Sequence, residues 1–100
     1  MSLIVAGCYR VPPEKLFALR PHMLTVIAAT RAEAGCLDYA YAEDVGEPGL
    51  IHVFELWTDQ AALDAHFQSP HMKAWQEVRA GYGLYDRNIS VYEVAGQRKV

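Results

Sequence analysis

The sequence has few cysteines, no long apolar run and no excess of basic residues. Its two cysteines, Cys8 and Cys36, form no CxxC motif, so we expect free thiols and a cytoplasmic location. The 9 Lys and Arg are scattered among 12 Asp and Glu, and the net charge of −3 argues against nucleic acid as a partner. No apolar run is long enough to span a bilayer, and the first residues lack the basic region of a signal peptide. We therefore expect neither membrane insertion nor export.

Motifs of several large enzyme classes are absent as well. The chain has no GxSxG turn, no phosphate-binding glycine loop and no dinucleotide fingerprint, so flavin and nicotinamide have no visible anchor. His66 and His71 lie five residues apart with Pro70 between them, which is a poor spacing for a chelate on one helix. No ligand set for iron or copper is visible either. The sequence predicts neither a metal site nor a cofactor.

Hydrophobic side chains are abundant for a chain of this length. They make up 52% of the residues, and aromatic residues make up 11%, whereas an apolar share of about 45–50% is usual. Residues 1–100 are expected to form a single domain, which at this size buries only about two thirds of its unfolded surface. The apolar excess suggests a surface for a partner subunit or a ligand pocket.

Hydrophobic periodicity predicts a strand and then a helix in the first third of the chain. Residues 2–10 alternate loosely, as a strand does, and Pro13 suits the first position of a helix. Apolar residues then recur at helical spacing from Leu16 to Ala34. Pro21 interrupts this pattern, so either the helix kinks there or a short turn precedes a new start. We expect Gly35 to end the helix in the left-handed conformation.

A hairpin follows the first helix. Residues 36–44 predict a strand with Leu37, Tyr39 and Tyr41 on one face. Residues 50–57 predict a second strand, and the short turn between the two makes the pair antiparallel.

The remaining chain predicts a broken helix and a last strand. Thr58 or Asp59 caps a helix that runs to about residue 68, and Ser69 with Pro70 then starts it again. Residues 84–94 predict the last strand, and residues 95–100 a loose tail. The order βαββαβ predicts an α+β, ferredoxin-like fold with a four-stranded antiparallel sheet and helices on one face.

The strand at residues 50–57 is largely apolar on both faces. Leu50, Phe54 and Leu56 point to one side, and Ile51 and Val53 point to the other. A strand with two apolar faces is normally buried on both. Because the helices cover only one face of the predicted sheet, we expect a second copy of the chain to cover the other, which predicts a homodimer.

Four side chains are candidates for a functional site. Glu55 points into an apolar layer and needs a partner, for which Arg87, Arg79, His66 or a tyrosine is available. Histidine is the natural proton acceptor near neutral pH, although His66 also suits a half-buried structural role. Trp57 and Trp75 suit stacking on a flat aromatic ligand as well as a plain core.

Four stretches of the sequence resemble one known family. The run Phe54-Glu55-Leu56-Trp57, the run Leu63-Asp64-Ala65-His66 and the step Ser69-Pro70-His71-Met72 resemble the signature of the antibiotic biosynthesis monooxygenase (ABM) domain. The string Glu33-Ala34-Gly35-Cys36, with Tyr39 after it, resembles the E-x-G-C…Y passage of that family. The closest similarity is to the quinol monooxygenase branch.

This resemblance implies a dimeric α+β barrel with a pocket between helices and sheet in each subunit. It implies oxygenation of a quinol or related polyphenol by O2 without metal or organic cofactor, since the substrate itself is the reductant. His66 would be the catalytic base or orient one. Tyr39, Glu55, Trp57, His71 and Trp75 would contact the small aromatic substrate.

Other activities in the family remain open at this stage. Haem-degrading relatives carry an asparagine in the first strand, and LIVAGCYR has none, so haem degradation is disfavoured. A branch that processes autoinducer sugars as an isomerase also shows a histidine followed by a Ser/Thr-Pro-His step, which His66 and His71 match. A non-enzymatic, ligand-binding dimer is the third alternative.

Overall fold

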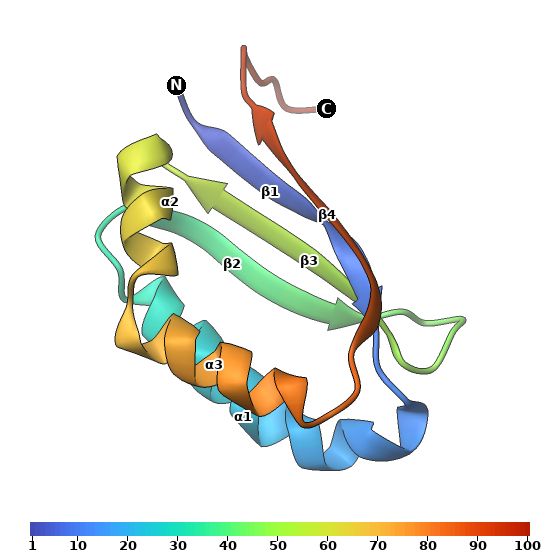
Figure 1. The fold of residues 1–100 in the computed structure, drawn as a ribbon. Helices are drawn as coiled ribbons and strands as arrows, with labels where there is room; N and C mark the ends of the chain where they lie inside the picture. The colour runs from blue at the N-terminus through green and yellow to red at the C-terminus, as the bar shows by residue number, and fades with distance from the viewer.

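The computed structural model describes residues 1–100 and shows one antiparallel sheet with helices on one side (Figure 1). The strands are β1 (Leu3–Arg10), β2 (Cys36–Glu43), β3 (Leu50–Trp57) and β4 (Tyr85–Glu93). The helices are the 3₁₀ helix η1 (Pro13–Lys15) and the α-helices α1 (Leu16–Arg31), α2 (Gln60–Phe67) and α3 (Pro70–Ala80). The sheet has four strands in the order β2-β3-β1-β4, all antiparallel, which confirms the ferredoxin-like prediction.

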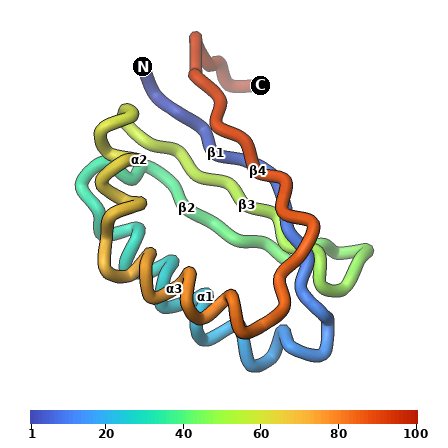
Figure 2. Tube along the Cα trace, viewed as in Figure 1, coloured from blue at the N-terminus to red at the C-terminus, as the bar shows by residue number.

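The helices cover the sheet unevenly. Figure 2 shows α1 and α3 on the β2 side of the sheet, whereas β4 lies at the opposite edge. Burial follows this arrangement, because alternate residues of β3 are buried and nearly all of β4 is exposed. The core therefore lies between the helices and β1 to β3, and the helix side of β4 is left open.

Helix α1 settles the two alternatives for Pro21. It begins at Leu16 and runs through Pro21 without a new start, so the restart alternative is wrong. Proline there removes only the bond from its own amide to the carbonyl of Phe17. The helix presents Leu16, Leu19 and Met23 to the core, as their spacing predicted.

Gly35 and Leu37 differ from their predictions. The helix ends at Arg31 and Gly35 has no positive φ, so Gly35 is not a left-handed cap. It is required for space instead, since a Cβ there would lie 2.2 Å from the Cβ of Ala62 in α2. A β-bulge between Cys36 and Asp38 turns Leu37 outward, where it is 56% exposed, and leaves Tyr39 fully buried on the helix side.

The break between α2 and α3 occurs where the sequence predicts it. Asp59 accepts a hydrogen bond from the backbone N–H of Ala62 at 2.8 Å and caps α2. Ser69 accepts one from Met72 N–H at 3.3 Å and caps α3, with Pro70 in the first turn. The break places His66 and His71 on different helices. No helix has the length and hydrophobicity that a bilayer crossing requires.

Candidate functional site

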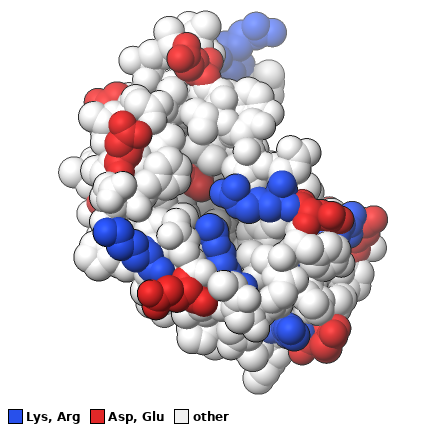
Figure 3. Space-filling model, in the orientation of Figure 1, with Lys and Arg blue, Asp and Glu red and all other residues white.

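A cavity of about 90 Å³ lies between the sheet and helices α2 and α3. Its polar lining comes from Tyr9, Tyr39, Tyr41, Glu55, Arg79 and Arg87, and the rest is apolar. Figure 3 shows basic side chains beside the hollow on this face of the molecule. The cavity exists because the helices stop short of β4. It is small beside the roughly 300–1,000 Å³ of pockets for drug-sized ligands.

Glu55 is the carboxyl group of this cavity. Strand β3 holds it on the helix side, where it is 7% exposed. Its Oε1 accepts a hydrogen bond from Nε1–H of Trp57 at 2.9 Å. Burial raises the pKa of Glu55 to about 7, and the Trp57 bond and the charge of Arg87 only partly oppose this. A carboxyl group titrating near neutral pH in a cavity is a typical proton acceptor.

The hydrogen-bond partner of Glu55 differs from those predicted. Arg87, Arg79, His66 and the tyrosines were the candidates, but the indole of Trp57 makes the bond. Residues two apart in a strand share a face, so the chain supplies this donor locally. Arg87 influences Glu55 through its charge alone.

Three tyrosines bring hydroxyl groups to the cavity. The hydroxyls of Tyr39 and Tyr41 lie 2.6 Å apart and share a hydrogen bond. The hydroxyl of Tyr9 is buried and has no partner in the chain. Burial raises the pKa of all three phenols, that of Tyr41 to about 12. They therefore stay protonated at neutral pH and can donate hydrogen bonds to a ligand.

Arg79 of α3 and Arg87 of β4 provide the positive charge of the cavity. Arg79 is half-buried and Arg87 is exposed. Burial, and to a lesser extent the charge of Arg87, lowers the pKa of Arg79. Arginine keeps its charge in proteins nevertheless, so two cations line this cavity.

His66, His71 and Glu33 form a cluster behind the cavity. Oε2 of Glu33 lies 2.7 Å from Nδ1 of His66 and 2.8 Å from Nε2 of His71. Because a carboxylate only accepts hydrogen bonds, both rings donate to it, and neutral His66 carries its lone pair on Nε2. That atom is buried and has no partner. Burial lowers the pKa of His66, although Glu33 opposes this shift. The three donor atoms, all within 4.8 Å of one another, are the group that could hold a metal.

The predicted site residues lie at three different places. Glu55 and Tyr39 line the cavity. His66 and Trp57 are fully buried behind it, with their ring centroids 4.8 Å apart. His71 and Trp75 border a separate groove between α1 and α3.

Sequence reasoning missed Tyr9 and Glu33. Tyr9 follows Leu3 and Val5 on the helix side of β1, so the alternation of that strand was the available signal. Glu33 lies in the turn after α1, where no periodicity applies, and was noticed only as part of the E-x-G-C string.

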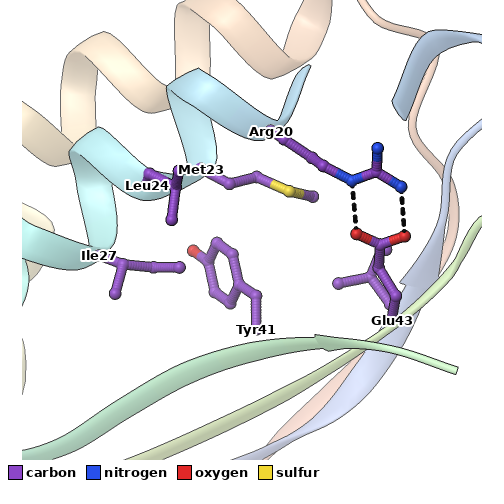
Figure 4. A pocket seen from close by; sticks show the side chains of 7 residues that line it. Arg20, Met23, Leu24, Ile27, Tyr41 and Glu43 are labelled. Carbon is purple, nitrogen blue, oxygen red and sulfur yellow. Dashed lines mark hydrogen bonds and ion pairs between the residues drawn. The ribbon is translucent and has the colours of Figure 1, made fainter. Parts of the chain in front are cut away.

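A second cavity, of about 160 Å³, lies between α1 and the edge of the sheet at β2. Apolar side chains and the ion pair of Arg20 with Glu43 line it (Figure 4). Nε and Nη2 of Arg20 donate to Glu43 at 2.7 and 2.8 Å. Tyr41 lines both cavities.

Known proteins resemble the chain over most of its length. Residues 2–78 match the family model described as antibiotic biosynthesis monooxygenase. The chain is 33% identical over 93 residues to the uncharacterized protein sll1783 of Synechocystis, covering 93% of this chain but only 63% of that protein. It is 32% identical over 76 residues to the protein named "Probable quinol monooxygenase YgiN" of Escherichia coli, covering 68% of this chain and 72% of that one. A Deinococcus radiodurans structure, proposed to be an antibiotic biosynthesis monooxygenase, has a TM-score of 0.89 at 25% identity and covers 100% of this chain and 98% of that one.

Proposed function

The chain belongs to the antibiotic biosynthesis monooxygenase family, and from this premise we propose that it is a cofactor-independent monooxygenase of a small quinol. A 1,4-hydroquinone and O2 would give a hydroxyquinone and one water, so one oxygen atom enters the ring and the other is reduced to water. The ring supplies all four electrons. The observation that supports this proposal most is the raised pKa of Glu55, about 7, in a cavity that also presents phenols and arginines. The name of the E. coli relative supports a quinol as the substrate class.

In this proposal Glu55 accepts the phenolic proton. A phenol has a pKa of about 10, so a base with a pKa near 7 matches neutral conditions well. The resulting phenolate is electron-rich and reduces O2. Arg79 and Arg87 would stabilise the negative charge on the phenolate and on reduced oxygen, and Tyr9 would donate a hydrogen bond. The apolar remainder of the lining limits access of water.

His66, the predicted catalytic residue, enters the proposal as a positioning residue. Its ring packs on Trp57, and Trp57 holds Glu55 through the indole N–H. We expect His66→Ala to lower turnover well below that of the wild type and to move the pH midpoint of kcat/KM. The reason is that Trp57, the hydrogen-bond partner of Glu55, loses the ring that holds it in place. A fall in stability with an unchanged pH midpoint would assign His66 a structural role alone.

Oxygen consumption with hydroquinone tests the main proposal. We expect uptake without added flavin or metal, and unchanged uptake in the presence of a chelator. With ¹⁸O2, one labelled atom should appear in the product. Hydrogen peroxide with no label in the product would show simple oxidation of the quinol and contradict monooxygenation.

The two arginines also support a second candidate, isomerisation of a small phosphorylated sugar-like metabolite. That reaction needs a cationic anchor, and Arg79 and Arg87 line the cavity. A proton-transfer reaction consumes no oxygen. Turnover of a sugar phosphate under argon, with no oxygen uptake on any quinol, would favour this candidate.

The bare face of the sheet supports a homodimer. Ile4 of β1 pairs with Leu56 on one side and Tyr92 on the other, so these apolar side chains are neighbours on this face. Phe54 is 40% exposed and Tyr92 is 55% exposed. Light scattering should give twice the chain mass of 11.2 kDa, and Phe54→Asp should shift the mass toward the monomer. A wild-type monomer at micromolar concentration would contradict the proposal.

A further inference from the structure

Arg79 and Arg87 differ from the other arginines of the folded domain in having no partner. Arg10 and Arg20 form ion pairs with carboxylates, and Arg31 donates to the backbone oxygen of Tyr39. No carboxylate lies within ion-pair distance of Arg79 or Arg87. Two neighbouring like charges destabilise each other unless an anion offsets them.

These two arginines lie where the inner cavity meets an outer groove. Both line the cavity that contains Glu55, and both line a groove of about 270 Å³ with Gln76 and Leu84. A ligand that passes from the groove into the cavity therefore meets both guanidinium groups. Planar guanidinium groups bind carboxylates and phosphates with paired hydrogen bonds.

Tyr9 supplies an independent sign of a polar ligand in the cavity. Its side chain lines the cavity, it is 3% exposed, and its hydroxyl has no partner within the chain. A buried hydroxyl without a partner is unfavourable, because desolvation is not compensated. A phenolic oxygen of a bound ring would provide the missing partner.

We propose that the substrate is an acidic phenol, whose anionic substituent binds between Arg79 and Arg87 while its hydroxyl-bearing ring occupies the cavity beside Glu55 and Tyr9. This inference rests on the proposed function and narrows its substrate class. Quinols without an acidic group would bind more weakly, because they are neutral when they bind and offer the two arginines a negative charge only after Glu55 has taken the proton.

Calorimetric titration under argon tests the inference without turnover. The probes are 2,5-dihydroxybenzoate, its neutral methyl ester and hydroquinone. We expect the acid to bind at least about tenfold more tightly than the ester, since charge-assisted hydrogen bonds are stronger than neutral ones. Raising the salt concentration should lower the affinity for the acid and leave the affinity for the ester unchanged.

Variants identify the residues responsible. Arg87→Gln removes an exposed charge with little risk to folding, and Arg79→Gln removes the half-buried one. Each single variant should reduce the preference for the acid over the ester, and the double variant should abolish it. Arg87→Lys should keep part of the preference that Arg87→Gln loses. Arg98→Gln, the same change in the tail, is the matched control and should keep the full preference.

The outcomes separate this inference from the proposed function. Equal affinity of the acid and the ester, failure of both to bind, or an unchanged preference in the double variant would overturn the inference. Selective binding of the acid without oxygen uptake in air would support the anion site and contradict the oxygenase. A tenfold preference for 2,5-dihydroxybenzoate together with oxygen uptake would support both.

Discussion

The second cavity, beside α1, will be called the cleft, and the cavity that contains Glu55 lies beneath α3. Tyr41 lines both, and each contains one glutamate and at least one arginine. In the cleft, Arg20 pairs with Glu43 and lowers the pKa of that carboxyl group. In the cavity, Glu55 is bound by an indole rather than an arginine, and burial raises its pKa to about 7. The same residue types therefore reach opposite electrostatic states within one core.

The difference lies in where each carboxyl group finds its partner. Glu43 is at the end of β2, where its side chain is 42% exposed and paired with the exposed Arg20 of α1. Glu55 is in the middle of β3, with the uncharged N–H of Trp57 as its donor. A neutralised pair suits a structural contact, whereas an unpaired acid and two unpaired arginines suit chemistry and binding. For this reason we propose that the functional site is the cavity that contains Glu55.

Replacing Glu55 and Glu43 separately should produce the largest difference between the cavity and the cleft. Glu55→Gln keeps an oxygen for the Trp57 N–H but cannot accept a proton, so we expect oxygen uptake to fall by roughly 100- to 10,000-fold, the usual range for a general base. Glu43→Gln should stay within about twofold of the wild type. Similar losses in both variants, measured as kcat, would contradict the assignment of the base.

The pH dependence of stability should separate the same two residues. The folded-state pKa of Glu55 is above its ordinary value of 4.5, so the folded state binds more protons than the unfolded state between pH 4.5 and about 7. The contribution of Glu55 to stability therefore falls as pH rises through this window, by on the order of 3 kcal/mol, since one pKa unit corresponds to about 1.4 kcal/mol.

Urea unfolding of the wild type and of Glu55→Gln measures this effect. The variant should lose the decline between pH 4.5 and 7. Glu43 acts in the opposite direction, because its lowered pKa stabilises the fold above its ordinary value of 4.5, and this contribution is lost as pH falls below that value. An identical pH dependence of stability from pH 4.5 to 7 in the wild type and in Glu55→Gln would contradict the raised pKa of Glu55, because buried His66 contributes equally in both proteins.

The sequence predicts the strands and helices around the two cavities well. Strand β3 and the break at Ser69 and Pro70 are strong local signals, because a dense β-branched and aromatic run and a capped proline each favour one structure. Leu37 was misplaced because a bulge shifts the alternation by one residue, and nothing in its own side chain marks that shift.

The site was less predictable because it depends on contacts between distant segments. The sequence indicated that Glu55 needs a partner, and that Arg79 and Arg87 were available. It could not show that the arginines stay unpaired, since that depends on where β4 lies relative to α3. The bridge from Glu33 to His66 and His71 joins three elements and has no periodic signature.

The shared wall offers a smaller test. Tyr41→Phe keeps the ring between the two cavities but removes the partner of the fully buried Tyr39 hydroxyl. Leaving a buried hydroxyl unpaired costs about 1–3 kcal/mol, which urea unfolding should detect. Tyr85→Phe, at the exposed start of β4, is the matched control and should change stability by less than about 0.5 kcal/mol. Equal effects would mean that the Tyr39–Tyr41 contact contributes nothing.

The smallest effect is expected at the ion pair that closes the cleft. The side chains of Arg20 and Glu43 are 47% and 42% exposed, so solvent screens their attraction, and exposed pairs contribute little to stability. A double-mutant cycle of Arg20→Gln and Glu43→Gln should give a coupling energy close to zero, decreasing further in salt. Arg20→Gln should also leave the affinity for 2,5-dihydroxybenzoate unchanged, although it removes the same charge as Arg87→Gln. Equal loss of affinity in Arg20→Gln and Arg87→Gln would show that the ligand responds only to the overall charge of the protein. If Arg20→Gln retains the affinity and Arg87→Gln loses it, the two arginines differ in their position and in their lack of a partner rather than in their charge.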